Sequence, residues 1–286
     1  MPSAVSTNES GPPAVSTIEE VTAYWNRRPC NIRHSPAEVG TREYFDEVEQ
    51  RKYFVEPHIR GFAQFSRWKG KKVLEIGCGL GTDSINFARA GADLTVIDVS
   101  EASVELCRRR FDVYGLSAKF YVGNAEELTN FLPPETYDLI YSFGVIHHTP
   151  HPRRVLSEVK NYCGPQTELR IMVYSRWSWK VLAIIAGHGK GAFWRAPELI
   201  RTYSEAETGC PVTYSYSRQG ARDLMGAFTV QQVWKDHIFP FRIAPYVRYE
   251  YKWVWYFRWM PPRLFHWLEQ RLGWHTMIVA DSLPEA

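Results

Sequence analysis

Short apolar runs alternate with helical patterns through the middle of the chain. The run at 73–76 predicts a buried strand that enters a glycine turn and then a helix, and a second run at 94–97 predicts another strand. Further strands are predicted at 119–122, from Tyr137 onward and at 168–174, the last after a turn at Gly164 and Pro165. Strands alternating with helices favour an α/β fold.

The segment 73–83 carries the strongest chemical signal in the chain. Glycines at 77, 79 and 81 let bare backbone approach a ligand at a helix N-terminus. Asp98 ends the second apolar run, twenty-three residues after Glu75, where an acid suits a ribose diol. Glu75 stands two residues before the first glycine, where its carboxylate would repel a pyrophosphate and attract a cationic or amino group. The pattern therefore predicts a nucleoside-containing cofactor without phosphate.

This E-x-G-x-G-x-G run with its spaced Asp98 resembles the first motif of the class I S-adenosylmethionine-dependent methyltransferases. The resemblance extends over roughly residues 70–175. It implies a Rossmann-like, doubly wound, seven-stranded sheet that binds S-adenosylmethionine and yields S-adenosylhomocysteine. The last two predicted strands, near 228–230 and 276–280, fit the family's terminal antiparallel pair.

The resemblance also implies how the cofactor is held. Glu75 and the glycines would hold the methionine end, Asp98 the ribose hydroxyls, and the loop at Asn124 the adenine. The predicted cofactor-binding residues are Glu75, Gly77, Cys78, Gly79, Gly81, Thr82, Asp83, Asp98, Val99, Asn124, Ala125, Glu126, Ser142, Phe143 and Gly144.

His147 and His148 follow the fourth strand, where the methyl acceptor should lie. A sulfonium methyl needs mainly in-line positioning, and a base is required only if the acceptor carries a proton that must leave. Either histidine is a candidate base, or both fix the loop by hydrogen bonds. The N/D-P-P-Y/F sequence of amide and exocyclic-amine methyltransferases is absent, with Ser142 to Val145 in its place. The expected acceptor is a small molecule methylated on O or N, with C- or S-methylation open.

The chain divides into five predicted parts. Residues 1–17 form a disordered start and 18–69 a helical lid, with a helix at 19–26 and a longer one at 41–62 interrupted at Pro57. The core spans 70–175, an insertion at 176–225 separates strands five and six, and 226–286 completes the core. The resemblance implies that the lid covers the cofactor and that the insertion forms a cap over the substrate site. A solvated loop is the alternative for the lid, and a small helical cap with its own core is the alternative for the insertion. The candidate substrate-binding residues are Tyr24, Trp25, Arg33, His34, Tyr174, Arg195, Arg201 and Tyr214.

Composition narrows the class of protein. With 34 basic and 31 acidic residues, the net charge of +3 gives no electrostatic case for nucleic acid as a partner. The five cysteines form no CxxC pair and favour reduced thiols in a cytoplasmic protein, and His and Cys spacing predicts no metal site. The longest apolar run outside the strands, at 181–186, is far too short to span a membrane, and no signal peptide is visible. The oligomeric state is left open.

Aromatic and basic residues are interleaved at 239–274. We expect this segment to pack on the core and the pocket wall, with a membrane-surface contact or a stacking platform for single-stranded nucleic acid as alternatives. The predicted function is methyl transfer to a small molecule, and a membrane-associated lipid or quinone methyltransferase is a variant of it. Two other classes of protein are considered. Glu75 and the glycine spacing argue against a nicotinamide-dependent oxidoreductase. The intact glycines and Asp98 argue against a non-catalytic cofactor-binding module.

Overall fold

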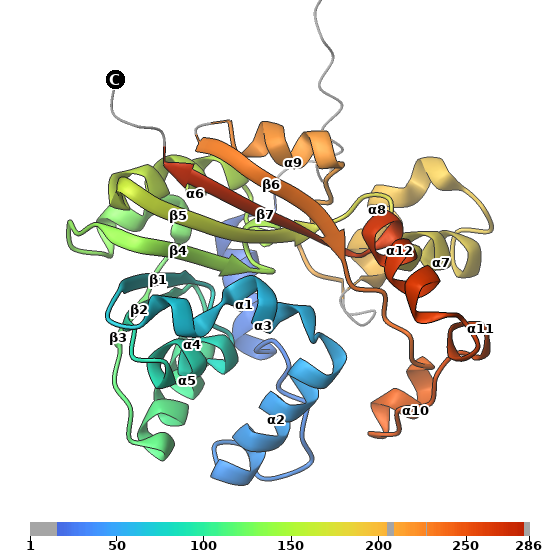
Figure 1. Ribbon diagram of the computed structural model, residues 1–286, viewed down its shortest axis with the longest axis horizontal. Helices are drawn as coiled ribbons and strands as arrows, with labels where there is room; N and C mark the ends of the chain where they lie inside the picture. The colour runs from blue at the N-terminus through green and yellow to red at the C-terminus, as the bar shows by residue number, and fades with distance from the viewer. Residues whose placement is uncertain (1–15, 205–208, 227, 283–286) are drawn as a thin grey trace, which may run out of the picture.

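The computed structural model describes residues 16–204, 209–226 and 228–282. Seven strands form one sheet in the order β3-β2-β1-β4-β5-β7-β6. The first five strands are parallel, β7 is antiparallel to β5, and β6 is antiparallel to β7 (Figure 1). This topology confirms the predicted Rossmann-like sheet with a terminal antiparallel pair.

Most strands lie where the apolar runs predict them, but two bounds differ. The predicted turn at Gly164 and Pro165 lies inside β5, which begins five residues earlier than expected. Pairing with β4 shifts there from Tyr137 opposite Cys163 to Leu139 opposite Glu168, and such an irregularity tolerates a proline. The strand β6 also runs beyond the predicted 228–230. The bounds are β1 Lys72–Ile76, β2 Asp93–Asp98, β3 Lys119–Val122, β4 Tyr137–Phe143, β5 Cys163–Tyr174, β6 Phe228–Asp236 and β7 His275–Ser282.

The N-terminal helices form as predicted. Thr17 and Glu20 make a capping box at the start of α1, and Thr41 caps α2. The break predicted at Pro57 separates α2 from α3. Residues 1–15 of the predicted disordered start lie outside the described residues. The main helices are α1 Ile18–Arg27, α2 Arg42–Val55, α3 His58–Ala63, α4 Thr82–Arg89, α5 Glu101–Tyr114, α6 Pro152–Val159, α7 Trp179–Gly187, α8 Ala196–Tyr203, α9 Arg218–Leu224, α10 Ile243–Val247, α11 Trp255–Arg258 and α12 Pro262–Leu272.

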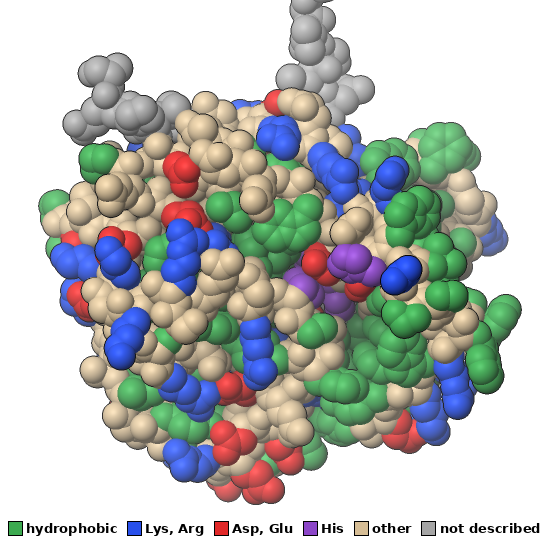
Figure 2. Space-filling view, viewed as in Figure 1, with side chains coloured by type: hydrophobic (Ala, Val, Ile, Leu, Met, Phe, Trp, Pro, Cys, Tyr) green, Lys and Arg blue, Asp and Glu red, His purple; other side chains and the backbone are tan. Residues whose placement is uncertain are grey.

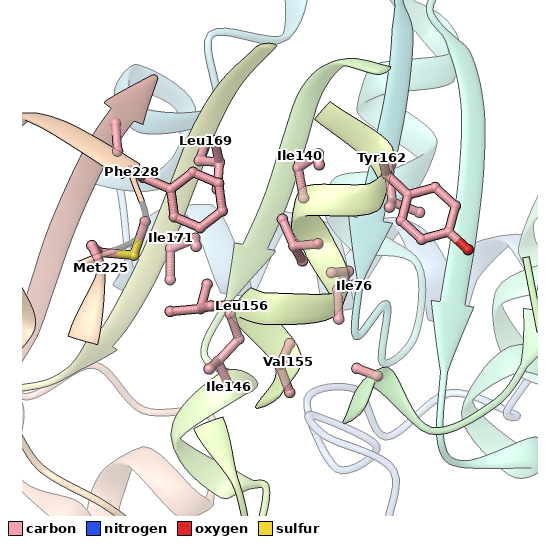
Figure 3. Close-up of a cluster of buried hydrophobic side chains, with 14 of the residues drawn as sticks. Ile76, Ile140, Ile146, Val155, Leu156, Tyr162, Leu169, Ile171, Met225 and Phe228 are labelled. Carbon is pink, nitrogen blue, oxygen red and sulfur yellow. The ribbon is translucent and has the colours of Figure 1, made fainter. Parts of the chain in front are cut away.

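Successive strand residues face opposite sides of the sheet, and each side has its own buried cluster. Leu74 and Ile76 pack with Leu156 of α6 and Met225 beyond α9 (Figure 3). Val73, on the other face, packs in the cluster that holds side chains from α4 and α5, including Phe87 and Phe111. The alternation therefore places Glu75 on the α4 side of β1.

The insertion at 176–225 contains a small core of its own. Val181 and Ile185 of α7 pack with Leu199 and Ile200 of α8, and Trp274 joins them from the segment before β7. Near its C-terminal end the insertion pairs with the main sheet, where Tyr216 forms a parallel bridge with Ser175. The insertion is thus anchored at the end of β5.

Residues 239–274, which we call the C-terminal arm, connect β6 to β7 through the short helices α10, α11 and α12 beyond one end of the sheet (Figure 1). The expectation that the arm completes the core holds for Phe257 and Trp274, which are buried. It is wrong for several other aromatic side chains, because Trp255 and Trp259 are 75% and 79% exposed. None of the helices in the described part of the chain is both long and apolar enough to cross a membrane.

Candidate active site

The glycine loop between β1 and α4 needs glycine for two reasons. Gly77 and Gly81 have φ values of 83° and 69°, which residues with a side chain rarely adopt. A Cβ at Gly77 would also lie 2.1 Å from Cγ2 of Val145, and one at Gly81 would lie 2.5 Å from Sγ of Cys107. At these two glycines the loop therefore has no room for a side chain and presents bare backbone at the carboxyl end of β1.

A cavity at the carboxyl ends of the parallel strands gathers most of the predicted cofactor-binding residues. Its walls come from the glycine loop, the tip of β2, the loop after β3 and the end of β4. The predicted cofactor residues that line it are Glu75, Gly77, Cys78, Gly79, Thr82, Asp83, Asp98, Val99, Asn124, Ala125, Phe143 and Gly144. Residues far apart in the sequence thus share one site.

Three predicted cofactor residues do not line this cavity. Gly81 caps α4 behind the loop. Ser142 is fully buried, and its hydroxyl donates to the carbonyl of Ile76. Glu126 is also buried, and its carboxylate accepts from the backbone amide of His151. The side chains of Ser142 and Glu126 thus bond to backbone groups of the protein and do not line the cavity.

Asp98 is held in place by backbone amides. Its Oδ2 accepts from the amide of Gly79 at 3.1 Å and its Oδ1 from the amide of Ser100 at 2.9 Å. Burial raises the pKa of Asp98, and these two hydrogen bonds oppose that rise. Each carboxylate oxygen has a further lone pair, so Asp98 can accept from ligand hydroxyls.

Glu75 is a buried carboxyl that suits a cationic ligand. The residue is only 2% exposed, and Oε2 of its carboxyl group has no hydrogen-bond partner among the described residues. Burial, with a further contribution from the Asp83 carboxylate, holds the pKa of Glu75 well above its usual range. An ammonium group in the cavity would stabilise the ionised form, whereas a phosphate would not.

Asp83, a predicted cofactor-binding residue, is hydrogen-bonded to other side chains of the protein. Its carboxylate accepts from Lys52 Nζ at 2.9 Å, from the Tyr53 hydroxyl at 2.9 Å and from the Tyr141 hydroxyl at 2.8 Å. These contacts join α2, α4 and β4. Asp83 lines the cavity, but its carboxylate is engaged by protein donors and holds the elements around the site together.

The helix α1 forms part of the cavity wall. It contributes Ile18, Val21 and Trp25, and the Trp25 ring packs edge-on against His148 with centroids 5.4 Å apart. Tyr174 at the end of β5 also lines the cavity. Of the predicted substrate-binding residues, Trp25 and Tyr174 are therefore at the site, and a role for α1 as a lid stays a prediction.

The other predicted residues of the N-terminal segment do not line the cavity. Tyr24 is buried beside Trp25. Arg33 is exposed, and its carbonyl accepts from the Tyr249 hydroxyl of the C-terminal arm. Burial, with a smaller effect of nearby Arg51, lowers the pKa of His34 to about 3. The backbone of Arg33 thus contacts the C-terminal arm, and neither Arg33 nor His34 lines the cavity.

The predicted residues of the insertion also lie elsewhere. Arg195 is exposed and pairs with Glu198 at 2.8 Å. Arg201 lines a separate hollow beside α1, and Tyr214 lines another beside α9. The Tyr214 hydroxyl donates to the carbonyl of Pro150. In this arrangement the insertion does not supply the roof that its arginines and aromatic residues predict.

The two histidines after β4 separate into different environments. His148 lines the cavity, and its Nδ1 lies 2.8 Å from the carbonyl of Val212. His147 is fully buried behind Tyr174, with ring centroids 3.8 Å apart, and it does not line the cavity. Burial holds the pKa of His147 well below its usual range, so its ring is neutral. Of the two histidines, only His148 lines the cavity.

Several residues that line the cavity could not be predicted from the sequence. Lys52 is one of them, because a lysine within a helix most often has a solvated side chain. Cys30 and Asn31 lie in the polar stretch between the first two predicted helices, and Asn31 has a φ of 65°. The lining residues that were not predicted are Ile18, Val21, Cys30, Asn31, Lys52, Ile76, Leu80, Ile97, Ser103, Gly123, Val145 and Thr149.

Comparison of the sequence with known proteins places it near methyltransferases. The family model described as a methyltransferase domain matches residues 73–166. The ubiquinone biosynthesis O-methyltransferase of Photobacterium profundum is 29% identical over 118 residues, which are 41% of this chain and 50% of that protein. The phthiotriol/phenolphthiotriol dimycocerosates methyltransferase of Mycobacterium tuberculosis is 35% identical over 98 residues, 34% of this chain and 35% of that protein. The chain thus spans half or less of the length of these relatives.

Solved structures share the fold. Magnesium protoporphyrin IX methyltransferase from Synechocystis PCC 6803, crystallised with S-adenosylhomocysteine, is 16% identical with a TM-score of 0.57 over 93% of this chain and 100% of that chain. The [4+2]-cyclase SpnF is 14% identical with a TM-score of 0.57 over 96% and 99% of the two chains, so the fold alone does not define the reaction. The family model described as a methyltransferase domain thus matches the segment that holds the glycine loop and Asp98, and the solved structures share the fold of the chain.

Proposed function

We propose that this protein transfers the methyl group of S-adenosylmethionine to an oxygen or nitrogen atom of a small-molecule acceptor. The observation that carries the proposal is the joint lining of one cavity by Glu75, the glycine loop, Asp98 and Asn124. The buried carboxyl of Glu75, whose Oε2 has no hydrogen-bond partner among the described residues, supports an amino-bearing ligand without phosphate. Names of the relatives, including an O-methyltransferase of ubiquinone biosynthesis, support methyl transfer as the reaction.

Residues of this chain have distinct tasks in the proposed site. The cofactor supplies an electrophilic methyl carbon when bound. Glu75 attracts the ammonium group of the methionine end, and Asp98 accepts from the ribose hydroxyls. The backbone at Ala125 and the amide of Asn124 border the adenine. Trp25, Phe143 and Tyr174 give the remaining wall an aromatic surface that excludes water from the acceptor side.

His148 is the proposed base for an acceptor that loses a proton. Because a carbonyl oxygen only accepts, the short contact with Val212 assigns the proton to Nδ1. In the neutral ring Nε2 then carries the lone pair that a base requires. His147 has no part in this step, since its ring is fully buried and does not line the cavity.

The test of this function is formation of S-adenosylhomocysteine from S-adenosylmethionine in the presence of a panel of phenols, carboxylic acids and amines. Turnover with an acceptor supports the proposal, and His148→Gln should lower kcat while leaving the affinity for S-adenosylhomocysteine unchanged. Binding of the cofactor without turnover on any O or N acceptor counts against methyl transfer.

Binding of S-adenosylhomocysteine is expected to release a proton from Glu75. Its raised pKa means that the carboxyl of the free protein holds its proton above the ordinary range, and a bound ammonium group favours the carboxylate. At pH 5.5, titration calorimetry in buffers of different ionisation enthalpy should show proton release. Glu75→Gln should abolish the release, and Glu105→Gln, a change at an exposed site on α5, should keep it. Identical heats in all buffers would contradict the assignment.

A second candidate function is methyl transfer to a lipid or quinone acceptor at a membrane surface. The observation that favours it is the exposed apolar surface of the C-terminal arm, seen beside basic side chains at the right of Figure 2. The arm carries six Arg or Lys residues and two Glu residues, a balance that suits anionic lipids. The exposed apolar side chains are Ile243, Val247, Trp253, Trp255, Trp259, Leu264 and Trp267.

Flotation with vesicles tests this surface. The wild-type protein should float with vesicles containing phosphatidylglycerol, less so at high salt. Changing Trp255 and Trp259 to Ala together should weaken binding tenfold or more, since burial of each large apolar side chain contributes about 1.5–3 kcal/mol. Phe131→Ala, an exposed aromatic residue outside the arm, is the control. Equal flotation of the double variant and the wild type would remove this candidate.

A further inference from the structure

Four ionisable side chains meet where the C-terminal arm joins the sheet. Glu56 caps the end of α2 and His58 begins α3, whereas His237 follows β6 and His275 begins β7. His237 and His275 are buried, and Glu56 and His58 are partly exposed. None of the four lines the cavity described above. The proposed methyl transfer gives this cluster no task.

The cluster has the dimensions of a metal site. One ligand atom each from Glu56, His237 and His275 all lie within 4.8 Å of one another. A cation with bonds of about 2.1 Å needs these atoms to approach by roughly 1 Å, which small side-chain rotations provide. The three imidazole rings contact one another, with centroid distances of 4.8 Å for His237 and His275 and 5.2 Å for His58 and His237.

One tautomer of His275 suits a cation at this position. Its Nδ1 lies 2.9 Å from Nε2 of His58, and its Nε2 lies 3.6 Å from Oε1 of Glu56. When the Nδ1 proton is donated to His58, the Nε2 lone pair faces the Glu56 carboxylate. Two electron-rich atoms that face each other are stabilised by a cation between them. A second hydrogen bond that fixes the ring is usual for a metal-binding histidine.

The backbone of His237 agrees with a functional position. Its φ is 69°, an uncommon conformation that often marks such positions.

We propose that Glu56, His237 and His275 bind a divalent transition-metal ion, with His58 orienting His275. Two imidazoles and a carboxylate suit Zn²⁺, Fe²⁺ or Co²⁺, whereas Mg²⁺ and Ca²⁺ prefer oxygen ligands alone. Spacing along the sequence does not predict this site, because its ligands come from three distant segments. Three protein ligands also leave coordination positions for water or for an anionic oxygen of another molecule.

The site lies next to the wall of the cofactor cavity. The rings of Phe143 and Tyr174, which both line that cavity, have centroids 5.4 Å and 6.3 Å from the ring of His275. Figure 2 shows histidine side chains gathered in a hollow between the sheet domain and the apolar arm. A metal here would link the base of the arm to the end of β4 and β5.

The test measures metal directly and does not depend on methyl transfer. Metal-free wild-type protein is dialysed against micromolar Zn²⁺, and bound zinc is measured by plasma mass spectrometry. One zinc ion per chain is expected. Glu56→Gln and His237→Asn should each lower the affinity at least tenfold, and His58→Asn should lower it about 10–100-fold through the orienting contact. Asn tolerates the positive φ at position 237.

The control variant is His266→Ala, which removes an exposed histidine from α12 and should leave zinc binding unchanged. Co²⁺ gives a second readout, because binding by His and Glu lacks the sulfur charge-transfer absorption that cysteine ligands produce. Circular dichroism shows which variants fold. If His237→Asn does not fold, Glu56→Gln tests the site, because Glu56 is the partly exposed ligand. No bound zinc in the wild type, unchanged affinity in a folded ligand variant, or an equal loss in His266→Ala would overturn the proposal.

Discussion

Replacement of Arg110 by Met is expected to lower the free energy of unfolding by about 3–5 kcal/mol, because it leaves buried acceptors without a donor. The side chain is 0% exposed and donates to the carbonyls of Leu80 and Phe45 and to the hydroxyl of Thr82. These contacts tie α5 to the glycine loop and to α2. Since Met fills a similar volume, the loss reports the missing hydrogen bonds more than a cavity.

Urea unfolding followed by circular dichroism measures the effect of Arg110→Met. The matched control is Arg108→Met, two residues earlier on α5, where the side chain is exposed and stacks on Phe120. That change should cost less than about 1 kcal/mol. Similar losses for the two variants would show that Arg110 does not hold the loop and α2 together.

Replacement of Asp98 by Ala is expected to weaken binding of S-adenosylhomocysteine by about 1–3 kcal/mol, through loss of charge-assisted hydrogen bonds. The carboxylate is fixed by the amides of Gly79 and Ser100, so it is in place before the ligand arrives. Titration calorimetry gives the dissociation constants of the two proteins.

The control for Asp98→Ala is Asp93→Ala, at the opposite end of β2. Asp93 is exposed and lies 3.9 Å from Lys119, outside the cavity. Its loss should change the affinity by less than about 0.5 kcal/mol. If Asp98→Ala binds S-adenosylhomocysteine as the wild type does, the ribose is not held by this carboxylate.

The cofactor side of the site could be predicted from the sequence because its signals are local. The glycines at 77, 79 and 81 have positive φ values, and each lies within a short stretch that reads as strand, turn and helix. The position of Asp98 relative to the glycine loop is predicted by the length of one strand–helix–strand unit. The structure places both signals at the same cavity, as the motif predicts.

The acceptor side could not be predicted in the same way, because its walls come from separate segments. Lys52 reaches the cavity through its ion pair with Asp83, which is thirty-one positions away. Arg195 is a plausible ligand for an anion by residue type, yet it pairs with Glu198 one helical turn on. The position of such a side chain depends on its ion-pair partner and on the path of the backbone in space. The residue type alone shows neither.

The C-terminal arm shows the limit of reasoning from hydrophobicity. Aromatic residues usually pack in the core, which led to the expectation that this segment completes it. The helices α10, α11 and α12 are short and lie beyond the sheet, so they have too few neighbours to cover Trp255 and Trp259. The same fold brings His237 next to His275, since these residues stand at adjacent ends of two paired strands.

Titration calorimetry of the wild-type protein with S-adenosylhomocysteine, and separately with NADH, tests the central claim most directly. One saturable site for S-adenosylhomocysteine per chain, with no heat of binding for NADH, is the predicted result. Its basis is the carboxyl of Glu75 at the methionine end and the carboxylate of Asp98 at the ribose. Binding of NADH, or no binding of S-adenosylhomocysteine by the folded protein, would contradict the claim.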